Sequence, residues 1–276
     1  MIDLSHRTEL ALVGLAVNHI RQCGAHDFFI VGAQARDILL NFQYSIKTER
    51  ATLDLDFGVM LESWQQYAAL RRALLATGQF VESGEEHRVR FGEMPVDLVP
   101  FGGIETVNGT IVWPRGGQQM NTVGFREALA HSVAVALPGN VSVQVAALPT
   151  QALLKILTWS ELRLERRSKD AQDFRTLVKT YSAVVGEERI ASEPEVLARE
   201  PFDFEYAGAW LLGRDAGLMH RDAPHFTTSV NSILTNTAGA AGMPTLVASM
   251  GGQSLQQNTG LAEWFRDGLQ RGLRGP

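Results

Sequence analysis

Two carboxylates stand one residue apart in the apolar stretch LDLDFGV, residues 53–59, as Asp54 and Asp56. Successive side chains of a strand face opposite sides, so both aspartates would project from one face, and Leu53, Leu55 and Phe57 from the other. Two carboxylates this close repel each other and raise each other's pKa unless a cation lies between or beside them. The spacing therefore predicts a bound cation.

A third carboxylate, Asp97, stands in the stretch PVDLVPF, where alternation turns it away from Val96 and Leu98. On a strand beside the first, it would complete a set of three acids able to hold two divalent ions roughly 4 Å apart, as in phosphoryl transfer. Magnesium takes oxygen ligands from carboxylates and substrate phosphates, so we expect two Mg²⁺ ions, with Mn²⁺ as a substitute, and a nucleotide. The alternative puts the paired aspartates on the solvated face of an edge strand and Asp97 in a turn.

A glycine turn precedes these acids in the stretch FIVGAQARD, in which Gly32 ends an apolar strand and a helix-like segment follows. The backbone N–H groups of Gly32 and Ala33, with the positive end of the following helix, would suit a phosphate. Arg36 has two interpretations: it contacts the phosphate, or it pairs with Asp37.

The elements that must position these residues follow from the hydrophobic pattern. It predicts helices over 5–23, 33–42 and 62–76, and strands over 28–32, 53–59, 87–92, 96–101 and 141–148, with a turn at 93–95. From Pro149 the pattern is helical. We therefore expect an α+β chain: a catalytic domain over 1–148, with a mixed β-sheet flanked by helices, and a helical domain over 149–276 that completes the active-site cleft.

Composition excludes several classes of protein. A formal charge of −5 over 276 residues is unlike a protein that coats nucleic acid by charge alone. The single cysteine, Cys23, excludes an intramolecular disulfide framework, and no Cys/His spacing suggests structural zinc. The longest N-terminal apolar run, LALVGLAV, predicts neither a signal peptide nor a membrane span, so we expect a cytoplasmic protein without a membrane partner.

Taken together, the glycine turn and the three acids resemble the DNA polymerase beta-like nucleotidyltransferase superfamily. The stretch VGAQARDILL is similar to the glycine turn of tRNA nucleotidyltransferases, and RATLDLDFGV, with Arg50 and Thr52, is similar to AbiEii-type nucleotidyltransferase toxins and their uncharacterised relatives. The resemblance implies a nucleotidyltransferase fold in which the acids bind magnesium and the turn holds the triphosphate. It assigns Arg36, Arg50 and Thr52 to the nucleotide site.

A later stretch, LLKILTWSELRLERRSKDAQDFRTL, extends the resemblance to the toxins, which carry a helix lysine and then a Lys-Asp-x-x-Asp helix. Here these residues are Lys155, Lys169, Asp170 and Asp173, and the resemblance implies that they bind nucleotide. From the residues alone, Lys155 is a solvated lysine on a helix. Asp170 and Asp173 share a helix face, with Lys169 placed to pair with Asp173 and Ser168 placed to cap the helix.

Other polar residues have weaker patterns. Arg88 and Arg90 alternate on the strand before Asp97, which allows both to face the same cleft as that acid. His220 and His225 are five residues apart, which is no recognised metal spacing, so we interpret them as part of a loop.

The expected activity is transfer of a nucleoside monophosphate from a nucleoside triphosphate to an acceptor hydroxyl, with release of pyrophosphate. The resemblance implies RNA, in particular tRNA, or a protein as acceptor, and extends to a toxin role with a separate antitoxin protein. Two other classes stay open: a transferase acting on a small molecule such as an aminoglycoside antibiotic, and a nucleotide-binding module without turnover.

Overall fold

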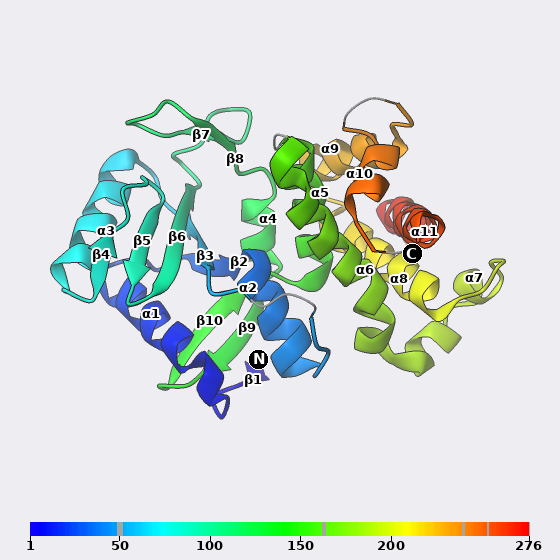
Figure 1. The fold of residues 1–276 in the computed structure, drawn as a ribbon, viewed down its shortest axis with the longest axis horizontal. Coiled ribbons are helices and arrows are strands. Elements are labelled where there is room, and N and C mark those ends of the chain that lie inside the picture. Colours follow the sequence, from blue (N-terminus) through cyan, green and yellow to red (C-terminus); the bar gives the residue numbers. More distant parts are fainter. Residues whose placement is uncertain (49–51, 162–163, 239–240, 253, 276) are drawn as a thin grey trace. The chain divides into compact units, whose positions relative to one another are not determined.

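The computed structural model describes the chain except for residues 49–51, 162–163, 239–240, 253 and 276, and except for the side chains of 164–167. The chain divides into two compact units, Met1–Ala147 and Leu148–Pro276 (Figure 1). The first unit contains all the strands in the described part of the chain, and the second is helical. In the described part of the chain, we find no helix with the length and apolar character needed to span a membrane.

An eight-stranded sheet forms the centre of the first unit, in the order β1-β9-β10-β2-β3-β6-β5-β4. Its strands are β1 (Ile2–Asp3), β2 (Phe28–Val31), β3 (Leu55–Met60), β4 (Phe80–Glu82), β5 (Arg88–Phe91), β6 (Met94–Phe101), β9 (Val133–Leu137) and β10 (Val141–Val145). A separate hairpin pairs β7 (Thr110–Val112) with β8 (Gln119–Asn121).

Both parallel and antiparallel pairs occur in the large sheet. Strand β3 runs parallel to β6 and antiparallel to β2, while β5 is antiparallel to both β6 and β4. The expected α+β class, with a mixed sheet and a helical C-terminal part, is therefore confirmed.

The helices of the first unit are η1 (Thr8–Leu10), α1 (Ala11–Gln22), α2 (Gly32–Asp37), α3 (Trp64–Ala76) and α4 (Phe125–Ala130), and α2 continues directly into the π-helical turn η2 (Ile38–Gln43). The order of strand, glycine and helix expected around Gly32 is present, because β2 ends at Val31 and α2 begins at the glycine.

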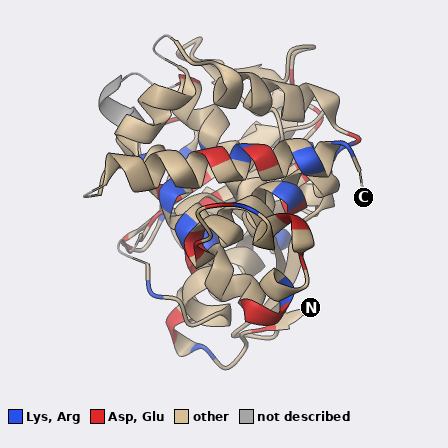
Figure 2. Cartoon of the chain, turned by 90° about the vertical axis from the view of Figure 1, so that its right-hand side faces the viewer, with Lys and Arg blue, Asp and Glu red and all other residues tan. Residues whose placement is uncertain are grey.

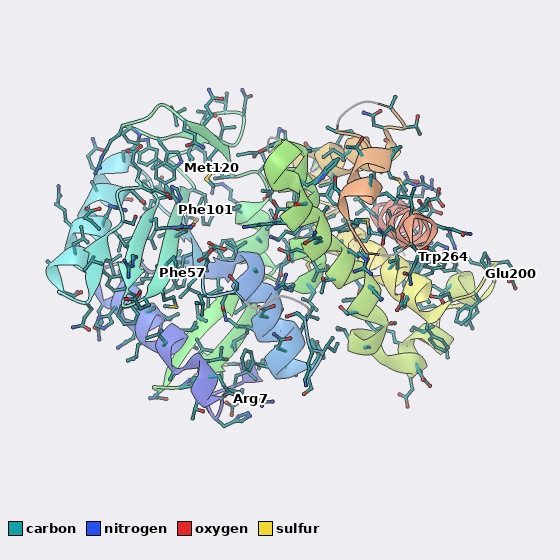
Figure 3. All side chains as sticks on the ribbon, viewed as in Figure 1. Arg7, Phe57, Phe101, Met120, Glu200 and Trp264 are labelled. Atoms are coloured by element: carbon teal, nitrogen blue, oxygen red, sulfur yellow. The ribbon has the colours of Figure 1, made fainter. Side chains whose placement is uncertain are left out.

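The two faces of the central strands differ in how far the apolar core extends. On one face Phe57 packs edge-on against Phe28, with ring centroids 5.7 Å apart. On the other face Phe101 packs against Phe29 and against Phe125 of α4, at 5.9 and 5.8 Å. Figure 3 labels Phe57 and Phe101. Asp56 and Asp97 belong to this second face, farther along the strands, where burial gives way to partial exposure.

Two predicted boundaries next to the acids were wrong: the turn between β5 and β6, and the start of β3. The β5–β6 turn lies at Gly92 and Glu93 rather than at 93–95, because Gly92 takes a φ of 59°, which a two-residue hairpin turn favours. Strand β3 begins at Leu55, so Leu53 precedes it and is 77% exposed instead of joining the apolar face.

The second unit consists of α5 (Leu148–Glu161), α6 (Leu164–Ala191), α7 (Pro194–Leu197), α8 (Phe204–His220), α9 (Pro224–Thr235), α10 (Met243–Ser249) and α11 (Leu255–Leu273). Helices α8 and α11 pack closely because glycines face the neighbouring backbone: a Cβ at Gly213 or Gly268 would collide with a carbonyl group of the other helix. Along α11, acidic and basic positions are interspersed (Figure 2). This helix therefore lacks the single sign of charge that binds a polyanion.

Candidate metal and nucleotide site

Asp56 and Asp97 lie directly opposite each other on the parallel strands β3 and β6. Paired positions of neighbouring strands share a face of the sheet, so the two carboxylates project on the same side. Both are half-buried, whereas their neighbours Leu55 and Leu98 are fully buried on the other face. The alternation that placed Asp97 on the same face as Asp56 is thus confirmed, whereas Asp54 precedes β3 and its face stays a prediction.

Asp54 lies just before β3, two residues from Asp56, and is exposed. Its backbone N–H donates to Thr52 Oγ1 at 3.1 Å, so the hydroxyl of Thr52 fixes the approach to the strand. Asp54 is accordingly the acid of this set most accessible to solvent.

The glycine turn lies against this acid pair. Val31, the last residue of β2, pairs with Asp56 across the antiparallel ladder, and Gly32 follows it. Gly32 has a φ of 76°, and a Cβ at this position would collide with Asp56 Oδ2. Glycine is therefore required twice, for its backbone angle and for its closeness to the carboxylate. Ala33 is half-buried in the first turn of α2.

Asp97 is held by an arginine of the neighbouring strand. Arg88 pairs with Asp97 across the β5–β6 ladder, and its Nε and Nη2 donate to Asp97 Oδ1 and Oδ2 at 2.6 and 2.8 Å. This bond to Asp97 raises the pKa of Arg88, although burial lowers it, and the charges of Asp97, Glu85 and Asp54 add to the increase. The guanidinium thus stays charged and lies in the field of the acids.

His87, beside Arg88, is a neighbour of this site that the sequence pattern did not suggest. Its Nε2 lies 3.9 Å from Asp97 Oδ2 and 3.0 Å from a carboxylate oxygen of Glu85. Its ring lies against that of the buried Trp113, with centroids 5.8 Å apart. The imidazole is therefore held at the edge of the acid face.

Helix α3 fixes the turn that carries His87 and Arg88. The buried Arg71 donates to the carbonyl oxygens of Glu86 and Arg88, both at 2.9 Å. Tyr67 donates to the carbonyl of Glu86 at 2.7 Å. The backbone of Arg88 is thus fixed, and any movement of its guanidinium must come from the side chain.

The donor chemistry fits magnesium, since carboxylate oxygens are the ligands this ion prefers. The arrangement fits less completely. Among the described residues, no three His, Cys, Asp or Glu side chains form a group that could hold a metal ion. Both oxygens of Asp97 are bonded to Arg88, and Asp54 is the exposed acid of the three.

The remaining predicted residues of the first unit divide as follows. Arg36 is 2% exposed, and its Nε donates to Asp37 Oδ1 at 2.9 Å. Of the two interpretations of Arg36, the structure therefore shows the pairing with Asp37. Thr52 bonds the backbone next to Asp54. Arg50 lies outside the described residues.

In the second unit, Lys155 of α5 lies between two carboxylates of α6. Its Nζ lies 2.7 Å from Asp170 Oδ1 and 2.8 Å from Asp173 Oδ2, and all three side chains are largely buried. Burial disfavours the charged ammonium, but the two carboxylates outweigh it and raise the pKa of Lys155. The interpretation of Lys155 as a solvated lysine was therefore wrong.

Two further expectations about this segment were wrong. Asp173 pairs with Lys155 of another helix rather than with Lys169, which is exposed. Ser168 lies inside α6, four residues after its first residue, and caps no helix end. The pattern gave the helix face correctly but not its partner, because the packing of α5 on α6 is not visible in the sequence of α6 alone.

The two histidines of the C-terminal part are helical, not part of a loop. His220 is the last residue of α8, and His225 follows the first residue of α9. His220 is 1% exposed, and its Nε2 lies 2.7 Å from Thr150 Oγ1. It therefore joins α8 to α5 inside the second unit.

No protein-family model matches the chain, and no curated protein matches it. Among solved structures, the chain is similar to the antibiotic-resistance factor ANT(2'')-Ia, whose solution structure is described as revealing substrate-regulated conformation dynamics. The sequence identity is 13%, the TM-score is 0.39, and the similarity covers 78% of this chain and 97% of that one.

Proposed function

We propose that the chain is a magnesium-dependent nucleotidyltransferase that moves a nucleoside monophosphate from a nucleoside triphosphate to an acceptor hydroxyl. The observation that carries this proposal is the pairing of Asp56 with Asp97 on one sheet face, with Gly32 against the carboxylate of Asp56. A backbone turn next to paired acids suits a phosphate chain and its cation.

Each residue has a defined part in this proposal. Asp54 and Asp56 hold the divalent ion, which when bound would neutralise phosphate charge and polarise the α-phosphorus. Asp97 accepts the proton of the attacking hydroxyl, and it would complete the ligand set once Arg88 releases its oxygens. The amides of Gly32 and Ala33 bind the phosphates. A bond forms between the acceptor oxygen and the α-phosphorus, the bond to the bridging oxygen breaks, and pyrophosphate leaves with both electrons.

The assignments taken from the sequence resemblance belong to the same proposal. The resemblance assigns Arg36, Arg50, Thr52, Lys155, Lys169, Asp170 and Asp173 to nucleotide binding. The acceptor is RNA, in particular tRNA, or a protein in the cytoplasm, and the activity is that of a toxin whose antitoxin is a separate protein. These points rest on the resemblance to AbiEii-type toxins.

The experiment is a transfer assay with each of four nucleoside triphosphates labelled at the α-phosphate, with Mg²⁺. Parallel reactions contain total tRNA, a protein extract, or a panel of aminoglycosides. Label in RNA or protein supports the proposed acceptors. Label in the aminoglycoside would replace them by a small-molecule acceptor, and binding of nucleotide without transfer would identify a non-catalytic module.

Asp54→Asn provides the decisive variant, because it removes the negative charge of one proposed metal ligand and changes no buried contact. Transfer should fall by about 10²-fold or more, the loss typical when a charge-stabilising group is removed from a transition state. Asp222→Asn is the matched control, since Asp222 has a 95% exposed side chain in the other unit and should retain full activity. Equal activity of Asp54→Asn and the wild type at saturating Mg²⁺ would refute the assignment.

A further inference from the structure

The bond between Arg88 and Asp97 uses both oxygens of the third acid of the proposed site. We propose that Arg88 is a positioning residue that competes with the divalent cation for Asp97. The inference rests on the proposed function, because it concerns the same three acids. It assigns Arg88 a role in setting how tightly the site binds a cation.

The geometry of the contact supports competition rather than coexistence. A guanidinium presents two parallel N–H donors that match the two oxygens of a carboxylate, and Arg88 uses this fork with distances of 2.6 and 2.8 Å. A divalent ion at the same oxygens would lie close to the positive charge of Arg88. Each oxygen keeps a second lone pair, so the two cations compete through their mutual repulsion.

The contact is built into the fold. Arg88 and Asp97 are paired by the hairpin register, and their side chains are 30% and 14% exposed. Arg71 bonds the carbonyl of Arg88 itself, which holds the backbone at this distance from β6. The arginine two residues later has no such surroundings: Arg90 pairs with Glu93, and these side chains are 42% and 95% exposed.

The charges near Arg88 show why a cation is held here. Besides Asp97, which Arg88 bonds, Asp56 lies opposite Asp97 on the neighbouring strand, so negative charges gather beside the guanidinium. The same field attracts any cation, so removing the guanidinium leaves acids that a divalent ion can neutralise. Arg88 acts as the built-in counter-ion of this part of the sheet.

The test is a titration of the full-length protein with Mn²⁺ alone, in which electron paramagnetic resonance measures the free ion. Arg88→Gln should bind Mn²⁺ about tenfold more tightly than the wild type, a difference of about 1.4 kcal/mol. Arg88→Lys keeps the charge but loses the fork, so its affinity should fall between the two. Arg90→Gln makes the same change of charge two residues away and should bind like the wild type.

Circular dichroism establishes that each variant is folded, and Arg88→Lys keeps the test valid if Arg88→Gln does not fold. Unchanged or weaker Mn²⁺ binding by a folded Arg88 variant would overturn the inference, as would an equal gain in Arg90→Gln. Mn²⁺ binding by Asp54→Asn distinguishes a failure of the competition between Arg88 and the cation from a failure of the proposed function. If Asp54→Asn binds Mn²⁺ as tightly as the wild type, the metal site itself is refuted; if it binds more weakly while Arg88→Gln is unchanged, only the competition is refuted.

Discussion

The two units of the chain each contain aspartates close to one basic side chain, in surroundings that differ in exposure. In the first unit, Arg88 bonds both oxygens of Asp97, and Asp54 is exposed. In the second unit, a single ammonium, that of Lys155, lies between Asp170 and Asp173, and all three are largely buried.

The difference separates acids that a further cation can reach from acids whose charge a buried ammonium already offsets. Around Lys155 the ammonium has a carboxylate on either side, and burial makes the loss of any member costly. At the sheet face, Asp54 is exposed to solvent, so a further cation can reach the acids there. Removing a charge should therefore damage the second unit and leave the stability of the first nearly unchanged.

Lys155→Met gives the largest expected change in stability. It leaves Asp170 and Asp173 buried without the ammonium, and breaking a buried ion pair in this way lowers the free energy of unfolding by about 3–5 kcal/mol. Urea denaturation monitored by circular dichroism measures the change. Lys169→Met is the control, since Lys169 is exposed on α6 and its loss should cost about 0.5 kcal/mol or less. Similar values for the two variants would contradict the distinction.

Gly32→Ala should destabilise the first unit by about 2–4 kcal/mol, because the new Cβ combines backbone strain with a collision at Asp56. Gly78 provides a matched control, since its φ of 68° is similar but a Cβ there meets no atom within 4 Å. Gly78→Ala should therefore cost only the strain, about 1–2 kcal/mol. Thermal denaturation compares the two variants, and equal losses would show that Gly32 does not touch the carboxylate.

Asp54→Asn should leave the free energy of unfolding within about 0.5 kcal/mol of the wild type in the absence of metal, as for other exposed positions. Asp170→Asn, the same chemical change at a buried ion pair, should cost several times more. Urea denaturation of both variants in a chelating buffer makes this comparison. A large loss in Asp54→Asn would show that the acid supports the fold rather than a ligand.

The smallest expected change concerns pH. The pKa of Lys155 is raised in the folded protein, so its stabilising contribution is complete below the pKa of an unfolded lysine, about 10.4. That contribution disappears only as the pH rises from this value through the folded pKa. The stability difference between the wild type and Lys155→Met should thus stay constant from about pH 7 to pH 9 and decrease above about pH 10.5. A decrease beginning near neutral pH would contradict the raised pKa.

Much of the sheet face could be predicted from local patterns. Alternation alone placed Asp56 and Asp97 away from Leu55 and Leu98, and the glycine after β2 identified the turn beside them. These features depend on the geometry of single strands, which the sequence encodes directly. Leu53 failed the same pattern because the strand begins two residues later.

The partners of these residues were less predictable, because they come from other elements. The bond of Arg88 to Asp97 follows from hairpin register: a two-residue turn at Gly92 and Glu93 sets Phe91 opposite Met94, and therefore Arg88 opposite Asp97. Because the sequence pattern predicted the turn one residue too late, it did not predict the pairing of Arg88 with Asp97. The partners of Lys155 required the packing of α5 on α6, for which the sequence contains no comparable rule.

The central claim is that the acids on the sheet face hold a divalent cation. The most direct measurement is the free energy of unfolding of the wild type and of Asp56→Asn with and without Mg²⁺. The wild type should gain about 2.7 kcal/mol when Mg²⁺ is one hundred times its dissociation constant, and Asp56→Asn should gain little at the same concentration. Equal gains in the two proteins, or no gain in the wild type, would contradict the claim.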